Sequence, residues 1–287
     1  MSSLRYLPTH NLRLSGGASP LEYNNLTSVR KQARAQTPDV VPHTTWAIRS
    51  SLRLRHHILK ATVLFALPLA LANASTCYGT PANGRLQDGV QLPAQGKNFV
   101  PYSSVGVALD RTYVHQSVRD IVVDAYDAVY QAAPDKRFMY GETGLADGGQ
   151  IKPHHTHQAG LSVDFMVPVL DSKNQPALLP SNALNKFGYG LEFDSNGVLG
   201  DLHIDFDAIA EHLHQLADAA EKRHVKIERV IFQKELATRL FQTSRGRDLR
   251  TTLPFMKTTP WIRHDEHYHV DFSLPCRPLS AYRRPVP

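Results

Sequence analysis

The chain has 287 residues, of which 42% are hydrophobic and 20% charged, and its formal net charge is +6. The positive charge belongs to the N-terminal quarter: residues 1–74 hold nine Lys or Arg and two acidic residues, so residues 75–287 keep 23 basic and 24 acidic residues, a net charge of −1. A nucleic-acid-binding surface needs an excess of cations on the folded part. The composition therefore excludes nucleic acid as the expected partner.

Two segments are distinguished at the N-terminus. Residues 1–50 are polar without a sustained period, which predicts disorder or an extension that precedes the true start of the protein. Residues 51–74 continue a basic stretch into the uncharged apolar run Ala61–Ala72 and end in the small-residue sequence Ala72-Asn73-Ala74. This order is typical of a secretory signal peptide. The apolar run is too short for a transmembrane helix, which would need roughly 20 apolar residues. We expect a periplasmic protein without a stable membrane anchor after cleavage.

Residues 75–287 have the length of one domain. Helices are predicted where apolar residues recur at helical spacing, and strands where short β-branched or aromatic runs occur. The predicted helices are 116–133, 206–223 with Asp205 as N-cap, and 234–242. The predicted strands are 138–142, 161–167, 227–232 and 267–272, with loops and short strands over 79–112 and a surface excursion over 170–200. The pattern predicts an α+β fold, with helices packed on a small, mainly antiparallel sheet.

Only two cysteines occur, Cys77 and Cys276, near the two ends of residues 75–287. In an oxidising periplasm this placement predicts one disulfide that joins the ends of the domain. The chain-entropy model assigns such a long loop a stabilisation on the order of 4–5 kcal/mol. The alternative is a pair of free thiols.

Two histidine clusters are the most informative feature of the chain. The first is His154-His155-Thr156-His157, and Asp164 follows seven residues after its last member. The second, His264-Asp265-Glu266-His267-Tyr268-His269, lies about a hundred residues further on. Zinc held by two imidazoles and one carboxylate, with a fourth position open, is typical of catalytic zinc sites. The clusters therefore predict metal-assisted hydrolysis.

Strand geometry favours the second cluster as a chelate. Alternate residues of a strand share a face, so His267 and His269 are expected to point to the same side, with Glu266 and Tyr268 pointing away. His212 and His214 have the same spacing but lie in a predicted helix, where positions i and i+2 do not face each other. Like the other isolated histidines, they are interpreted as surface or core residues. These others are His115, His203 and His224.

The clusters resemble a known family. His154-x-x-His157-Gln158-x-Gly160-Leu161-x-x-Asp164, together with His264-Asp265-x-His267-x-His269-Val270, is similar to the penicillin-insensitive murein endopeptidases. These belong to a wider group of zinc peptidases that includes lysostaphin-type enzymes and D-alanyl-D-alanine carboxypeptidases. The resemblance extends loosely over residues 78–276. Two departures are the small number of cysteines and Glu266, where an aspartate is more usual.

The resemblance implies one Zn²⁺ per chain, bound by His157, Asp164 and His269. It places His267 beside the reacting water and His154 and His264 further out in the active site. The implied reaction is hydrolysis of D-alanyl-meso-diaminopimelyl cross-links in peptidoglycan.

The general base stays open between two residues. His267 is favoured by the strand face that it shares with His269, and Glu266 is the rival because some relatives use a carboxylate three residues before the last ligand. Two alternative functions also stay open, a zinc D,D-carboxypeptidase and a non-catalytic zinc-dependent wall-binding protein.

Overall fold

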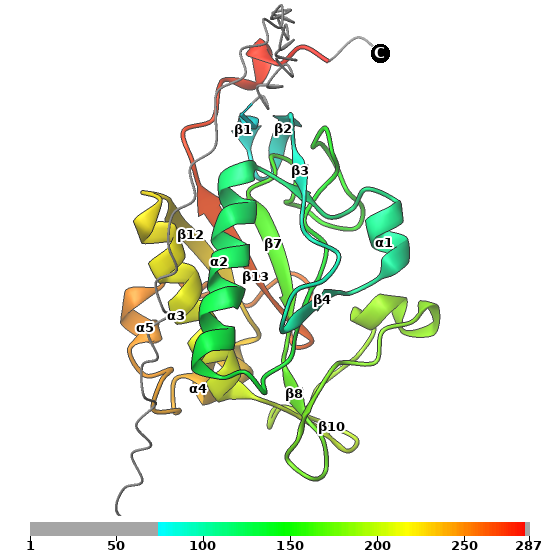
Figure 1. Ribbon diagram of the computed structural model, residues 1–287, viewed down its shortest axis with the longest axis vertical. Helices are drawn as coiled ribbons and strands as arrows, with labels where there is room; N and C mark the ends of the chain where they lie inside the picture. The colour runs from blue at the N-terminus through cyan, green and yellow to red at the C-terminus, as the bar shows by residue number, and fades with distance from the viewer. Residues whose placement is uncertain (1–73, 285–287) are drawn as a thin grey trace, which may run out of the picture. The chain divides into compact units, whose positions relative to one another are not determined.

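A computed structural model describes residues 74–284, and its centre is a five-stranded sheet (Figure 1). The strand order is β12-β13-β7-β6-β4, and every pairing is antiparallel except β4 with β6. The strands are β4 Phe99–Pro101, β6 Phe138–Tyr140, β7 Ser162–Met166, β12 Lys226–Ile231 and β13 His267–Ser273. The prediction of an α+β fold with a mainly antiparallel sheet is confirmed.

Smaller sheets and helices surround this centre. The antiparallel pair β1–β2 joins Thr76–Thr80 to Asn83–Gln87, and β3–β5 joins Val90–Gln91 to Tyr113–Val114. A four-stranded sheet consists of β8 Val169–Leu170, β9 Pro176–Ala177, β10 Val198–Leu199 and β11 Leu202–Ile204. The helices are α1 Ser104–Ala108, α2 Gln116–Ala132, α3 Phe206–Lys222, α4 Lys234–Leu240 and α5 Leu249–Thr252, with 3₁₀ turns η1 Ala183–Gly188 and η2 Leu279–Ala281.

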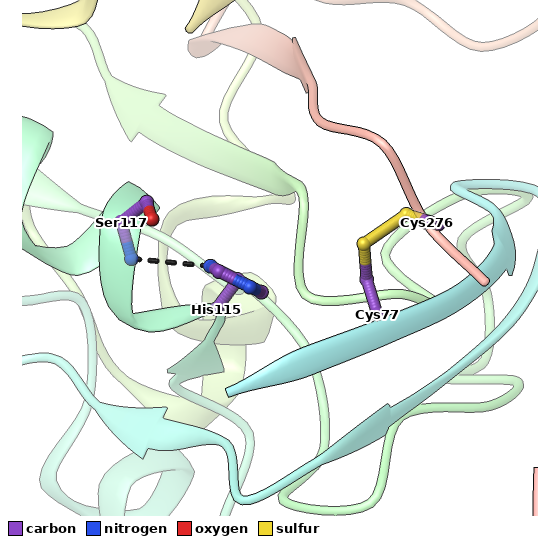
Figure 2. The surroundings of a disulfide bond; sticks show 4 residues. All are labelled: Cys77, His115, Ser117 and Cys276. Carbon is purple, nitrogen blue, oxygen red and sulfur yellow. Dashed lines mark hydrogen bonds between the residues drawn. A yellow bond between two sulfur atoms is a disulfide. The ribbon is translucent and has the colours of Figure 1, made fainter. Parts of the chain in front are cut away.

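The two long helices begin where the sequence supplies a cap. The Asp205 carboxylate accepts a hydrogen bond from the Ala208 amide at 3.0 Å, which confirms it as the N-cap of α3. His115 caps α2 in the same way, because its Nδ1 accepts from the Ser117 amide at 3.1 Å (Figure 2). Both helices then bury the apolar stripe that predicted them.

Two expectations for the irregular segments were wrong in part. Residues 105–109 were expected to form loop or strand, but residues 105–108 belong to α1 and Leu109 is its C-cap. The N-cap of this helix, Ser103, accepts from the amides of Val105 and Gly106. The excursion over 170–200 contains η1 and parts of the four-stranded sheet, and it buries Leu179 and Phe193. A local cap and a few buried side chains therefore impose more order than turn-rich composition suggests.

The helices α2 and α3 cover one face of the large sheet, and the core lies between these two layers (Figure 1). Phe165 of β7 and Tyr268 of β13 are direct cross-strand partners whose stacked rings lie 5.4 Å apart. His212 of α3 is fully buried against them, with its Nδ1 at 2.6 Å from the Tyr268 hydroxyl. Its interpretation as a core histidine is confirmed.

A disulfide between Cys77 and Cys276 joins the first strand of the described region to the segment that follows the last one (Figure 2). Backbone hydrogen bonds reinforce it, because the Arg277 amide donates to the Cys77 carbonyl and the Gly79 amide donates to the Arg277 carbonyl, each at 2.9 Å. The predicted pairing of the cysteines is confirmed.

The N-terminal expectations, an extension over 1–50 and a signal peptide over 51–74, lie outside the described residues except for Ala74. Within residues 74–284, no helix is long and apolar enough to cross a bilayer.

Burial gives His212 a pH-dependent role in stability, because it lowers the pKa of this side chain to about 3. As the pH falls below about 6.5, the unfolded chain binds a proton there and the folded chain does not, so stability decreases towards acid. Between pH 6.5 and 4.5 we expect the wild type to lose about 2 kcal/mol more unfolding free energy than His212→Phe.

Urea denaturation at the two pH values, with a chelator present, measures this difference. The His214→Gln variant on the same helix is the matched control and should keep the wild-type loss. Equal pH dependence in His212→Phe and the wild type would contradict the prediction.

Candidate metal centre

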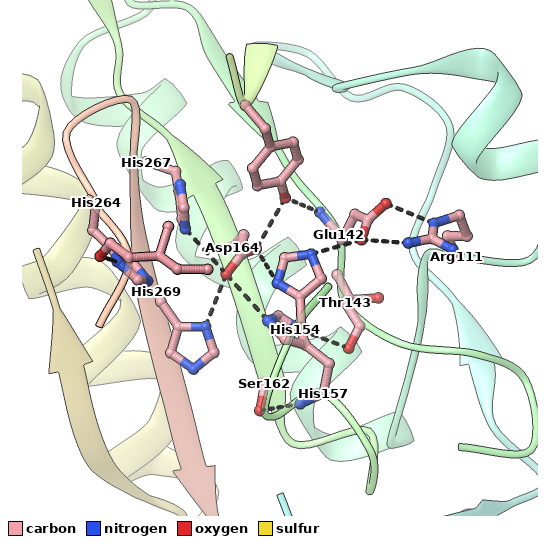
Figure 3. Close-up of polar contacts among 12 residues, drawn as sticks. Arg111, Glu142, Thr143, His154, His157, Ser162, Asp164, His264, His267 and His269 are labelled. Carbon is pink, nitrogen blue, oxygen red and sulfur yellow. Dashed lines mark hydrogen bonds and ion pairs between the residues drawn. The ribbon is translucent and has the colours of Figure 1, made fainter. Parts of the chain in front are cut away.

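The site is built around Asp164, a fully buried carboxylate on β7 (Figure 3). The register between β7 and β13 places Asp164 directly opposite His269, and the His269 Nδ1 lies 2.8 Å from the Asp164 Oδ1. Directly opposite residues on one face of a sheet have adjacent side chains. Strand pairing therefore brings together two residues that are 105 positions apart in the chain.

His157 lies in the loop before β7 and points its Nε2 at the same oxygen, Asp164 Oδ1, at 3.3 Å. Its Nδ1 lies 3.0 Å from the Thr143 carbonyl oxygen, an acceptor only, so Nδ1 carries the proton. Burial lowers the pKa of His157, so the ring is neutral and Nε2 offers a lone pair. That Nε2 is buried without a hydrogen-bond partner. Two acceptors facing each other across a buried gap fit a cation between them.

His154 approaches Asp164 from a third direction. Its Nδ1 lies 3.7 Å from the Asp164 Oδ2, and its Nε2 lies 2.7 Å from the Glu142 Oε2. Ligand atoms of His154, His157 and Asp164 all lie within 4.8 Å of one another, so this triad could hold a metal ion. The set expected from the sequence shares His157 and Asp164 with the triad and has His269 in place of His154.

A second carboxylate lies behind His269. The Asp271 Oδ1 is 2.8 Å from the His269 Nε2, and Asp271 also accepts from Ser162 at 2.6 Å and from the Arg229 guanidinium. Burial opposes ionisation of His269, but Asp271 and Asp164 on either side outweigh it and raise the pKa of His269 to about 10. Without a metal, this imidazolium is itself the cation beside Asp164.

A hydrogen-bonded network centred on Glu142 orients His154 from the side opposite Asp164. The Arg111 guanidinium makes a two-pronged ion pair with Glu142, at 2.6 and 2.8 Å, and the Tyr102 hydroxyl donates to the same carboxylate at 2.8 Å. Burial would raise the pKa of Glu142, but hydrogen bonds from His154 and Arg111 lower it to about 2. The carboxylate is therefore ionised and holds His154 by its Nε2.

His267 faces the centre with Nε2 3.8 Å from the Asp164 Oδ1, and Tyr268 points away into the core, as strand alternation predicts. The expectation that Glu266 also points away is wrong. Glu266 precedes β13, and its Oε1 lies 2.9 Å from the His267 Nδ1. His264 lies beside them, with ring centroids 4.6 Å apart from His267, and burial together with His267 lowers its pKa to about 4.

These side chains border a cleft of about 650 Å³. Its floor holds His154, His267 and His269. One wall is formed by residues of η1 and Tyr189, and the other by Trp261 and Ile262, each about half exposed. The cleft is therefore open, apolar at its rim and rich in imidazole at its floor.

The structure thus brings all seven residues predicted from the sequence into one neighbourhood. Asp164 provides the central carboxylate and four of the histidines surround it. The remaining two residues, His264 and Glu266, border His267. Sequence reasoning missed Arg111, Glu142 and Tyr189. The Tyr189 hydroxyl donates to the Asp164 Oδ2 at 2.9 Å and accepts from the Glu142 amide at 2.7 Å. No motif signals these three, because each comes from a different loop.

Comparison with known protein families gives one match. The family model described as penicillin-insensitive murein endopeptidase matches residues 77–282, which include every residue of the site. A search of curated proteins finds no matching relative.

Removal of the Glu142 charge should destabilise the fold, because Arg111 would then be left without its two-pronged partner. Breaking a buried pair typically costs 3–5 kcal/mol, and the Arg111 side chain is 26% exposed, so we expect about 2 kcal/mol for Glu142→Gln. Chemical denaturation measures the loss. The matched control Asp127→Asn, in the exposed pair with Lys97, should change stability by less than about 0.5 kcal/mol. Equal effects of both variants would contradict the role given to Glu142.

Proposed function

The chain belongs to the penicillin-insensitive murein endopeptidase family, and from that premise we propose that it is a zinc-dependent hydrolase of peptide cross-links in peptidoglycan. The observation that carries the proposal is the buried Nε2 of His157, which has no hydrogen-bond partner and faces the Asp164 carboxylate. Nitrogen and carboxylate ligands in this combination suit zinc, and a free position is typical of catalytic sites.

The ligands that we propose are His157, Asp164 and His269. The Nδ1 of His269 lies nearer to Asp164 than the Nδ1 of His154 does, at 2.8 against 3.7 Å. Asp271 behind His269 is the outer carboxylate that accompanies most histidine ligands of metals. A bound zinc ion would act as a Lewis acid that activates water and polarises the scissile carbonyl.

Proton transfer falls to His267 in this proposal. The Nδ1–H of its ring donates to Glu266, which leaves Nε2 directed at the centre. Nε2 would accept the proton of the attacking water and return it to the nitrogen of the leaving amine. Glu266 would orient the His267 ring and stabilise its imidazolium form. Of the two candidates for general base, His267 would therefore accept the proton and Glu266 would support it. His154 and His264 border the cleft where the substrate carbonyl would lie.

We further propose that the protein acts in the periplasm, after removal of the predicted signal peptide. The Cys77–Cys276 disulfide agrees with an oxidising compartment. Peptidoglycan, the substrate that the family name implies, lies in that compartment.

Metal analysis of two histidine variants tests the ligand set. We expect His269→Ala to lose zinc. Its affinity for the metal should fall by more than roughly 100-fold, the upper range for residues that only hydrogen-bond to a ligand. His154→Ala should keep its zinc. Mass spectrometry of the dialysed proteins gives the zinc content, and competition with a chelating dye gives the affinity. Retention by His269→Ala with loss from His154→Ala would place His154 in the ligand set instead.

Activity of two further variants tests the proton transfer. With zinc still bound, His267→Ala should lower kcat/KM by on the order of 10²–10⁴-fold, because it removes the base itself. Glu266→Gln should lose less, because the ring stays in place. The opposite order, with His267→Ala the more active variant, would assign the base to Glu266.

Muropeptide profiling tests the function as a whole. Sacculi incubated with the purified protein should show conversion of cross-linked dimers to monomers, and a zinc chelator should abolish it. Penicillin should have no effect, because residues 75–287 contain no Ser-x-x-Lys sequence with which to form an acyl-enzyme. Loss of terminal D-Ala alone would indicate a carboxypeptidase. No change with zinc-loaded protein would indicate a wall-binding protein.

A further inference from the structure

One wall of the cleft contains an unusual backbone. Lys186 and Phe187, both in η1, have φ values of +53° and +57°, and both line the cleft. Left-handed backbone is uncommon for residues other than glycine, and two such residues in succession are held only by surrounding contacts. Observed strain of this kind is a reason to look for a function at the position.

The contacts that hold this wall are present. Asn182 and Asn185 cap each other, with the Asn185 side chain accepting from the Asn182 amide and from the Gly188 amide, each at 3.0 Å. The Phe187 ring packs edge-on against Tyr102 with centroids 6.4 Å apart. Tyr189, just beyond η1, donates its hydroxyl to Asp164. The position of Lys186 is thus coupled to the metal centre through a short, tightly bonded segment.

Lys186 differs in charge from the rest of the cleft. Of the carboxylates in the lining, Glu142 is paired with Arg111 and His154, and Glu266 with His267. Among the residues of the cleft lining, Lys186 supplies the one Lys or Arg side chain. It is exposed, and in residues 74–284 no carboxylate forms an ion pair with it. A solvent-facing ammonium group beside an apolar rim is suited to an anionic group of a ligand.

We propose that Lys186 binds the carboxylate on the carbon that carries the scissile nitrogen, and so selects the substrate on the leaving-amine side. This inference rests on the proposed function. In a D-alanyl-meso-diaminopimelyl bond, the nitrogen that leaves is attached to a carbon whose own carboxyl group takes no part in the cross-link. That carboxylate lies next to the bond cut at the zinc site. Phe187 and Trp261 offer apolar surface to the uncharged parts of the stem peptide.

The test compares two soluble cross-linked dimers that differ only at this carboxyl group, free in one and a primary amide in the other. We expect the wild type to cleave the free acid with kcat/KM about tenfold higher or more, and Lys186→Gln to reduce the ratio to about 2. Lys186→Arg keeps the charge and should keep the preference. Lys173→Gln, an exposed lysine in the β8–β9 turn outside the cleft lining, is the matched control and should also keep it.

Lys186→Gly separates lost charge from a distorted loop, because glycine adopts this backbone without steric penalty. Its Tm should equal or exceed that of the wild type while its preference falls as in Lys186→Gln. An unchanged ratio in Lys186→Gln, an absent preference in the wild type, or an equal loss on both dimers would overturn the assignment of Lys186 and leave the endopeptidase proposal standing. Failure of the zinc-loaded wild type to cleave either dimer would overturn both.

Discussion

The site depends on one buried carboxylate. Asp164 has no contact with water, and a charge in that position is costly unless each oxygen has partners. His157, His267 and His269 approach its Oδ1, while His154 and the Tyr189 hydroxyl approach its Oδ2. Burial would raise the pKa of Asp164, but the hydrogen bond from the His269 imidazolium and the charge of His267 lower it, so the carboxylate remains ionised. A negative charge kept in the protein interior is a permanent attraction for a cation.

Two adjacent strands serve both the core and the site. On one face of β7 and β13, the pair Phe165 and Tyr268 packs against α3, and on the other face the neighbouring pair Asp164 and His269 forms the centre. A register slip of one residue would exchange the two faces and bury charge against the helices. The hydrophobic core therefore determines the geometry of the polar site.

The sequence predicts the parts of the molecule that depend on periodicity and spacing. Apolar stripes give α2 and α3, Asp205 marks a helix start, and the alternation of His267 and His269 gives their shared face. It does not predict contacts that depend on tertiary placement. Glu266 lies one residue before its strand, where alternation no longer governs its side chain, and it turns towards His267. Arg111, Glu142 and Tyr189 lie on separate loops, so their meeting around His154 and Asp164 has no local signature.

The chemistry and the cleft walls occupy different kinds of structure. Apart from Tyr189, which belongs to a wall and also contacts Asp164, the residues that surround Asp164 are held by paired strands or by loops fastened to them. The walls come from the irregular segments around η1 and Trp261. Surface connections tolerate insertions and exchanges that paired strands do not. During divergence, the walls can be rebuilt for cross-links of other composition while the hydrolytic centre is inherited intact. A designer seeking a new bond preference would accordingly randomise residues 182–188 and 258–262 and leave the sheet untouched.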